Sequence, residues 1–136
     1  MNERIGGATI SLCMIVRNEH RHLARCLESA AAAVDEIVIV DTGSTDDTRE
    51  IARGFTDKVY DFVWQDDFAL ARNYAFSKAT KDFLFWMDAD DVLEPQDAQR
   101  LIALKRTIGQ NADVVMLPYY VGINARGAPA LTYYRE

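Results

Sequence analysis

Features that define several large classes of protein are missing from this sequence of 136 residues. Cys13 and Cys26 are its two cysteines and have no CxxC spacing, which argues against a disulfide framework and a cysteine zinc site. No apolar run reaches the roughly 18 residues that a transmembrane helix needs. Residues 1–7 lack the apolar core of a signal peptide. We therefore expect a cytoplasmic protein with reduced core thiols, leaving open a membrane association of the full-length protein.

Motifs for common ligands are also absent. Neither GxGxxG nor GxxxxGK(S/T) occurs, so neither a Rossmann fingerprint nor a Walker loop is supported. His20 and His22 lie two apart at a helix start and do not share a helical face, which argues against a histidine metal site. The formal net charge of -6 argues against a nucleic-acid partner. It leaves room for a phosphate-bearing small molecule, which needs only local positive charge or a metal ion.

Apolar β-prone runs alternate with segments of helical period. Strands are expected at 9–16, 36–40, 58–62, 83–87, 114–121 and 130–134, and helices at 19–33, 44–53, 68–79 and 95–108. This order predicts an α/β fold with three α/β/α layers and a mostly parallel sheet, with an antiparallel addition at the end. We expect a flexible segment over residues 1–8 and one domain over 9–136. Strand character continues to Tyr134, so we expect the domain to be truncated after Glu136.

The most informative segment is FLFWMDADD, residues 83–91. A short apolar run predicts a buried strand, and three carboxylates follow it at the end where open α/β sheets bind ligands. Asp88 and Asp90 offer the hard oxygen ligands that suit Mg²⁺ or Mn²⁺. The alternative is an acidic turn that caps the helix starting at Pro95, with Asp91 or Glu94 near its amino end. The segment alone leaves both interpretations open.

Polar groups also follow the first two expected strands. Arg17 and Glu19 flank Asn18, which could bind a ligand or cap the next helix. Asp41 ends the second strand, where an acidic residue can accept hydrogen bonds from a ribose or a base N–H. Ser44, followed three residues later by an aspartate, resembles a capping box that opens a helix.

A further group precedes and enters the third expected helix. Asp66 and Asp67 are suited to cap this helix, which begins near Phe68. Arg72 in its second turn presents a planar fork suited to phosphate or a base carbonyl. The alternative is an ion pair between Arg72 and one of the capping aspartates.

Four motifs together resemble the nucleotide-sugar-binding part of family 2 inverting glycosyltransferases of GT-A fold. They are SLCMIVRNE (11–19), VDEIVIVDTGSTDDT (34–48), DDFALARN (66–73) and FWMDADD (85–91), and they match the family pattern in order and spacing. The resemblance covers residues 9–102. The third motif looks most like a bacterial subgroup in which this domain often precedes helical repeats.

The resemblance implies roles for individual residues. Asp41 would bind the nucleotide base, uracil or a similar edge, with Arg17, Glu19 and Ser44 around the same pocket. Arg72 would help to hold the base or diphosphate. Asp88 and Asp90 would form the DxD pair, with Asp90 on Mg²⁺ or Mn²⁺ and Asp88 on the ribose or a metal-bound water.

The same resemblance implies a metal-dependent transfer, with inversion, from a UDP-linked or other nucleotide-diphosphate sugar to an unidentified glycan, lipid or protein. The general base of such an enzyme is an acidic residue in the acceptor part, and we expect it beyond Glu136. The chain itself would then be inactive. A non-catalytic nucleotide-sugar or metal-binding fragment and a Mg²⁺-dependent aspartyl phosphatase are the alternatives. Uncovered apolar strands, such as 114–120, could also drive a homodimer.

Overall fold

The computed structural model describes residues 7–108, 119–123 and 129–132. In chain order the elements are β1 (Ile10–Val16), α1 (Leu23–Ala30), the short 3-10 helix η1 (Ala31–Ala33), β2 (Glu36–Asp41), α2 (Thr48–Arg53), β3 (Val59–Asp61), α3 (Phe68–Ser77), β4 (Phe83–Trp86), α4 (Pro95–Ile108), β5 (Tyr119–Ile123) and β6 (Pro129–Thr132). The expected order of strands and helices is confirmed. The first half of the strand expected at 114–121 lies outside the described residues, so the surface proposed for a homodimer is not described.

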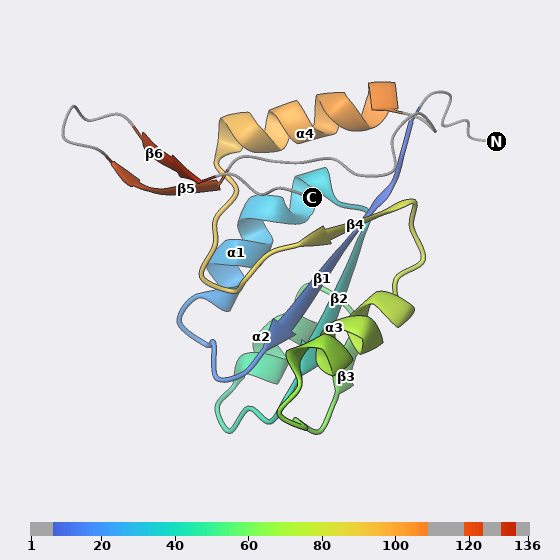
Figure 1. Cartoon of the computed structure of the whole chain (residues 1–136), viewed down its shortest axis with the longest axis vertical. Helices are drawn as coiled ribbons and strands as arrows, with labels where there is room; N and C mark the ends of the chain where they lie inside the picture. Colours follow the sequence, from blue (N-terminus) through green and yellow to red (C-terminus); the bar gives the residue numbers. More distant parts are fainter. Residues whose placement is uncertain (1–6, 109–118, 124–128, 133–136) are drawn as a thin grey trace.

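Four parallel strands form the main sheet in the order β3-β2-β1-β4. Parallel pairing sets Val16 beside Asp41 and Cys13 beside Trp86. The loops that follow β1, β2 and β4 therefore leave the sheet at one edge, as the crossover order predicted. The antiparallel addition differs from the expectation, because β5 and β6 pair with each other as a separate sheet (Figure 1).

Helices cover both faces of the main sheet, which confirms the three-layer α/β/α class. Strand β1 alternates its side chains between the faces: Leu12 and Met14 pack with α1 and α2, while Cys13 packs with α3. Both sides are buried, which explains why β1 is a nearly unbroken apolar run. Helix α4 packs on Ile10 and Ala33 at the amino end of the sheet, away from the edge where the strands end (Figure 1).

The boundaries of the first helix differ from the expectation. A helix was expected over 19–33, but residues 19–22 form a turn and α1 begins at Leu23. The turn is closed by the amides of His22 and Leu23, which both donate to the carbonyl of Glu19. The final residues of the expected helix, Ala31–Ala33, form the 3-10 helix η1. This shortening leaves Arg17 to Glu19 in a loop.

A buried carboxylate ties the strands together at their amino end. Glu36 accepts hydrogen bonds from Ser11 Oγ (2.5 Å) and from the Thr80 amide (2.8 Å), and it pairs with Lys58. Burial alone raises the pKa of Glu36, but the hydrogen bonds from Lys58, Ser11 and Thr80 outweigh it and hold this pKa at about 2. Glu36 is therefore a structural residue, remote from the ligand edge.

The two thiols are free and buried, as expected. Burial, reinforced by nearby carboxylates, raises the pKa of Cys13 to about 11 and that of Cys26 to about 12. Ala8 lies inside the segment expected to be flexible, yet it is buried and donates its amide to the Lys105 carbonyl at 2.8 Å. In the part of the chain that the structure describes, no helix is long and apolar enough to cross a membrane.

Candidate functional site

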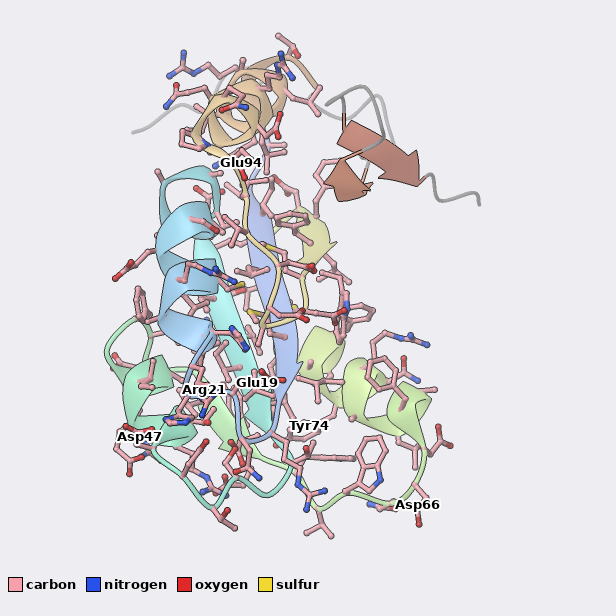
Figure 2. The ribbon with its side chains drawn as sticks, turned by 90° about the vertical axis from the view of Figure 1, so that its left-hand side faces the viewer. Glu19, Arg21, Asp47, Asp66, Tyr74 and Glu94 are labelled. Atoms are coloured by element: carbon pink, nitrogen blue, oxygen red, sulfur yellow. The ribbon has the colours of Figure 1, made fainter. Side chains whose placement is uncertain are left out.

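Predicted site residues gather at the edge where the parallel strands end. Arg17 and Glu19 follow β1, Asp41 ends β2, and Asp88 follows β4. In Figure 2, Glu19 lies beside the lower end of β1, with the loop before α2 on one side and the loop before α3 on the other. Strand order produces this grouping, because β1 lies between β2 and β4.

Asp41 is 1% exposed and holds its two carboxylate oxygens in different surroundings. The Oδ1 atom accepts hydrogen bonds from the amides of Gly43 (2.9 Å) and Ser44 (2.8 Å). Gly43 has a φ of +122°, a conformation that glycine adopts without strain and that turns the chain back over the carboxylate. Among the described residues, the buried Oδ2 atom has no hydrogen-bond partner. Since a buried acceptor without a donor is costly, Oδ2 is suited to receive a donor from a ligand.

Arg49 is a site residue that the sequence analysis missed. Its Nη2 lies 3.1 Å from Asp41 Oδ1, its Nε donates to Asp61 at 2.8 Å, and its Nη1 donates to the Ser44 carbonyl at 2.9 Å. Asp41 and Asp61 are paired neighbours at the ends of β2 and β3. An arginine on the helix between two such acidic strand ends is the signal that could have identified it.

Asn18 and Ser44 do not cap helices, and the capping-box prediction is wrong. Asn18 has a φ of +53°; its amide donates to Ser44 Oγ at 2.9 Å and its Oδ1 accepts the Thr45 amide at 2.8 Å. Helix α2 begins at Thr48, whose amide donates to the Asp46 carboxylate at 3.0 Å. The loops after β1 and β2 are thus joined by side chains that the sequence pattern assigned to local caps.

Glu19 follows the first strand and lies near the acidic turn. It is half-buried, and its amide donates to Thr48 Oγ1 at 2.9 Å. Burial raises the pKa of Glu19, and the charges of Asp90 and Asp88 raise it further. Glu19 therefore lies within the electrostatic field of the acidic turn. Arg17 is exposed beside it.

Three carboxylates follow β4 in a compact turn. Oxygen atoms of Asp88, Asp90 and Asp91 all lie within 4.8 Å of one another, close enough to share one cation. Met87 and Ala89 are buried in the core, whereas Asp88 and Asp90 are exposed. Partial burial raises the pKa of Asp88, and the charges of Asp91 and Asp90 add to this effect. A divalent cation would relieve that repulsion with the oxygen ligands that Mg²⁺ and Mn²⁺ prefer.

Of the two residues in the helix-capping alternative, Glu94 precedes Pro95 and its carbonyl accepts the amides of Asp97 and Ala98, both at 2.9 Å, whereas Asp91 is used within the turn itself. The Asp91 Oδ2 atom accepts the amide of Asp88 at 2.9 Å, while the Asp91 amide donates back to the Asp88 carbonyl at 3.0 Å. These bonds close the turn on itself, before α4 starts at Pro95. The carboxylates of the turn are therefore organised around each other.

Arg72 lies on α3, on the other side of the sheet from α1. Its guanidinium carbon is 5.4 Å from the centroid of the Phe68 ring, and Phe68 in turn contacts Trp86 with ring centroids 5.7 Å apart. Asp67 accepts the Ala69 amide at 3.0 Å, which confirms it as the helix cap. The aromatic contacts connect the first turns of α3 to the end of β4.

Of the two histidines, His20 lies in a group of possible metal ligands among the described residues, and His22 does not. His22 is the residue before α1, whereas His20 Nδ1 lies 3.6 Å from Asp47 Oδ1. His20, Asp46 and Asp47 form a second small cluster of possible metal ligands at the surface. Asp46 in this cluster already accepts the hydroxyl and amide of Thr48, at 2.5 Å and 3.0 Å.

Comparison with known proteins gives related sequences over most of the chain. The family model described as Glycosyl transferase family 2 matches residues 11–133. A TPR repeat-containing protein of Synechococcus elongatus is 48% identical over 86 residues, covering 63% of this chain and 21% of that protein. The SPbeta prophage-derived glycosyltransferase SunS of Bacillus subtilis is 31% identical over 120 residues, covering 86% of this chain and 28% of SunS. The chain thus spans between about a fifth and somewhat over a quarter of the length of these relatives.

Solved structures share the fold. TarS 1-349 of S. aureus superposes with a TM-score of 0.60 at 25% identity, covering 71% of this chain and 32% of that one. Glucosyl-3-phosphoglycerate synthase of Mycobacterium tuberculosis, crystallised with Mn²⁺ and UDP-glucose, superposes with a TM-score of 0.54 at 24% identity, covering 62% and 34%. The order of the motifs, the parallel sheet and the family match agree, and the chain belongs to glycosyl transferase family 2.

Proposed function

We propose that this chain is the donor-binding part, residues 9–136, of a glycosyltransferase that takes its sugar from a UDP-linked donor with a divalent metal ion. The observation that carries the proposal is that two features occur together at one edge of the sheet. Among the residues that the structure describes, Asp41 Oδ2 is a buried acceptor without a hydrogen-bond partner, and Asp88, Asp90 and Asp91 hold three carboxylates within 4.8 Å. A base N–H suits the first feature, and a metal-bound diphosphate suits the second.

Each residue has a role in this proposal. Asp41 accepts the N–H of the base, and Arg49 holds its carboxylate fixed in direction. Asp90 and Asp88 hold Mg²⁺ or Mn²⁺, which when bound supplies the positive charge that stabilises the departing diphosphate. Arg72 on α3 contributes a guanidinium for the base or diphosphate.

The region after β1 completes the proposed pocket. Arg17 brings a positive charge to the edge, and Glu19 a carboxylate close to Asp90 and Asp88. Ser44 holds the loop after β2 against the loop after β1 through its hydrogen bond with the Asn18 amide. The pocket would thus be formed by segments that follow three strands.

Transfer with inversion also needs a base that removes the proton of the acceptor hydroxyl. The proposal assigns this base, and the acceptor site, to sequence beyond Glu136. The relatives support this assignment because they are several times longer than the matched region. A cytoplasmic location is part of the proposal and is supported by the two free thiols.

Calorimetric titration of the chain with UDP, with and without Mn²⁺, tests the proposal. We expect Mn²⁺ to tighten UDP binding in the wild type, Asp90→Ala to remove that gain, and Asp41→Asn to weaken UDP binding with or without metal. Binding that is indifferent to Mn²⁺ and to Asp90→Ala would contradict the transferase site.

The two alternatives predict different outcomes. Family membership and the position of the acidic turn after the fourth strand argue against the aspartyl phosphatase. A phosphate monoester assay with a burst of product would reopen that alternative. A non-catalytic binding fragment would bind UDP and Mn²⁺ yet release no sugar from a UDP-sugar, even when joined to the sequence that follows it.

A further inference from the structure

The loop that carries the acidic turn is attached to helix α1 at two points. The buried thiol of Cys26 donates to the carbonyl of Asp88, with Sγ 3.6 Å from the oxygen. One turn further along α1, Ser29 Oγ accepts the amide of Leu93 at 2.9 Å. Figure 1 shows the loop between β4 and α4 running beside α1. The two contacts hold the loop at the first of the three carboxylate residues and two residues after the last.

Cys26 and Ser29 belong to one hydrogen-bonded unit. The hydroxyl of Ser29 donates to the Cys26 carbonyl at 2.7 Å, which fixes its oxygen to receive the amide of Leu93. The Asp88 carbonyl accepts both the Cys26 thiol and the Asp91 amide, the latter at 3.0 Å. The thiol therefore contacts the same oxygen that closes the acidic turn.

Apolar packing against α1 also restricts the loop. Met87 and Ala89, on either side of Asp88, are buried in the cluster that also contains Cys26, Leu23 and Leu27. A turn held by core packing alone could shift along the apolar surface, because such contacts are not directional. Two hydrogen bonds to α1 remove that freedom and fix the direction in which the carboxylates leave the loop.

We propose that Cys26 and Ser29 are positioning residues that hold the Asp88–Asp91 turn in the geometry that binds the divalent ion. The proposal rests on the proposed function, since it concerns the metal of the same site. Groups that orient metal ligands in this way commonly change metal affinity by about 10- to 100-fold when they are removed. Neither side chain reaches the nucleotide pocket at Asp41 through any of these contacts, so their effect should be confined to the metal.

Calorimetry on the full chain separates positioning from general stability. The quantity measured is the gain in UDP affinity that Mn²⁺ provides, obtained from titrations with and without the metal. We expect Ser29→Ala and Cys26→Ala each to reduce this gain about tenfold, with metal-free UDP binding unchanged. Cys26→Ser, which keeps a donor at the position, should recover most of the gain.

Cys13→Ala is the matched control. Cys13 is an equally buried thiol that faces α3, with Sγ 4.0 Å from the carbonyl of Ala75. Its loss should lower the thermal midpoint without changing the gain from Mn²⁺. The proposal is overturned when the gain is unchanged in both the Cys26→Ala and Ser29→Ala variants, or when it falls as much in Cys13→Ala.

Amide hydrogen exchange gives a readout that needs no ligand. Exchange of the Leu93 amide should accelerate in Ser29→Ala, and exchange of the Asp91 amide should accelerate in Cys26→Ala. Each variant lacks one of the side-chain hydrogen bonds that restrain the loop. Unchanged exchange at both amides overturns the positioning role. A wild-type chain that binds UDP neither with nor without Mn²⁺ overturns the proposed function instead, and the exchange rates then still decide whether α1 restrains the turn.

Discussion

The guanidinium of Arg49 on α2 lies 3.1 Å from Oδ1 of Asp41, a carboxylate buried at the end of β2. The same oxygen accepts hydrogen bonds from the amides of Gly43 and Ser44, so these three donors all approach one side of the carboxylate. This leaves Oδ2 buried and without a partner among the described residues. The relationship fixes which atom of Asp41 is presented to a ligand.

Replacing Arg49 with Met should weaken both folding and nucleotide binding. The change leaves the buried charge of Asp41 without its counter-ion, and a buried carboxylate that loses its partner is destabilising. We expect a lower thermal midpoint and UDP binding weakened several-fold, measured by thermal melts and calorimetry. Arg53→Met, an exposed arginine on the same helix, is the control and should change neither.

Replacing Asp41 with Asn should reverse the hydrogen-bonding character of the site. Two backbone amides require an acceptor at the Oδ1 position, so the asparagine oxygen must lie there and its NH₂ group must take the Oδ2 position. A donor would then face the donor of the base. We expect UDP affinity to fall by about tenfold or more, from the loss of one charged hydrogen bond. An equal loss in the exposed control Asp57→Asn would contradict this explanation.

Mn²⁺ should stabilise the chain through the acidic turn. Because the pKa of Asp88 is raised, the turn is destabilised as the pH rises through that pKa and the carboxylates repel each other. A bound cation removes the repulsion, so Mn²⁺ should raise the thermal midpoint more at neutral pH than in acid. Asp88→Asn and Asp90→Ala should abolish the increase. Asp97→Asn, on α4, should retain it.

Glu36 should make folding sensitive to acid. Its pKa is about 2 in the folded chain, below the ordinary value of 4.5, so its stabilising effect is fully present above 4.5 and is lost as the pH falls toward 2. The expected loss is on the order of 2–3 kcal/mol, discounted because Lys58 is partly exposed. Urea unfolding across this pH range measures it. The Glu36→Gln variant should have a lower free energy of unfolding at neutral pH, and this free energy should change less as the pH falls. The exposed control Glu28→Gln should behave as the wild type.

Much of the fold was predictable because its signals are local. The apolar run of β1, the helical period of α3 and Pro95 at the start of α4 each reflect the conformation of neighbouring residues. The boundaries were less predictable. Residues 19–22 were expected to be helical. The Asn18 amide and carboxamide instead form hydrogen bonds with the loop after β2, and the chain between Asn18 and α1 stays out of the helix.

The sequence identified the site residues at the strand ends, but not the residues that hold those side chains in place. Asp41 and Asp88 follow apolar strands, and that position alone marks them. Cys26 carries no such mark, since a cysteine on an apolar helix face is ordinary, and Arg49 is marked only by its place on the helix between two acidic strand ends. Their importance comes from the atoms that they meet: Oδ1 of Asp41 and the carbonyl of Asp88.

By itself, the sequence determined the α/β order of elements, the family and the acidic segment after the fourth strand, because hydrophobic period and motif spacing are properties of the chain. Only the tertiary structure decided that β1 lies between β2 and β4. This parallel pairing brings Asn18 to Ser44, 26 residues away, and Cys26 to Asp88, 62 residues away. Such contacts depend on which strands share an edge, and no local preference of these residues encodes that choice.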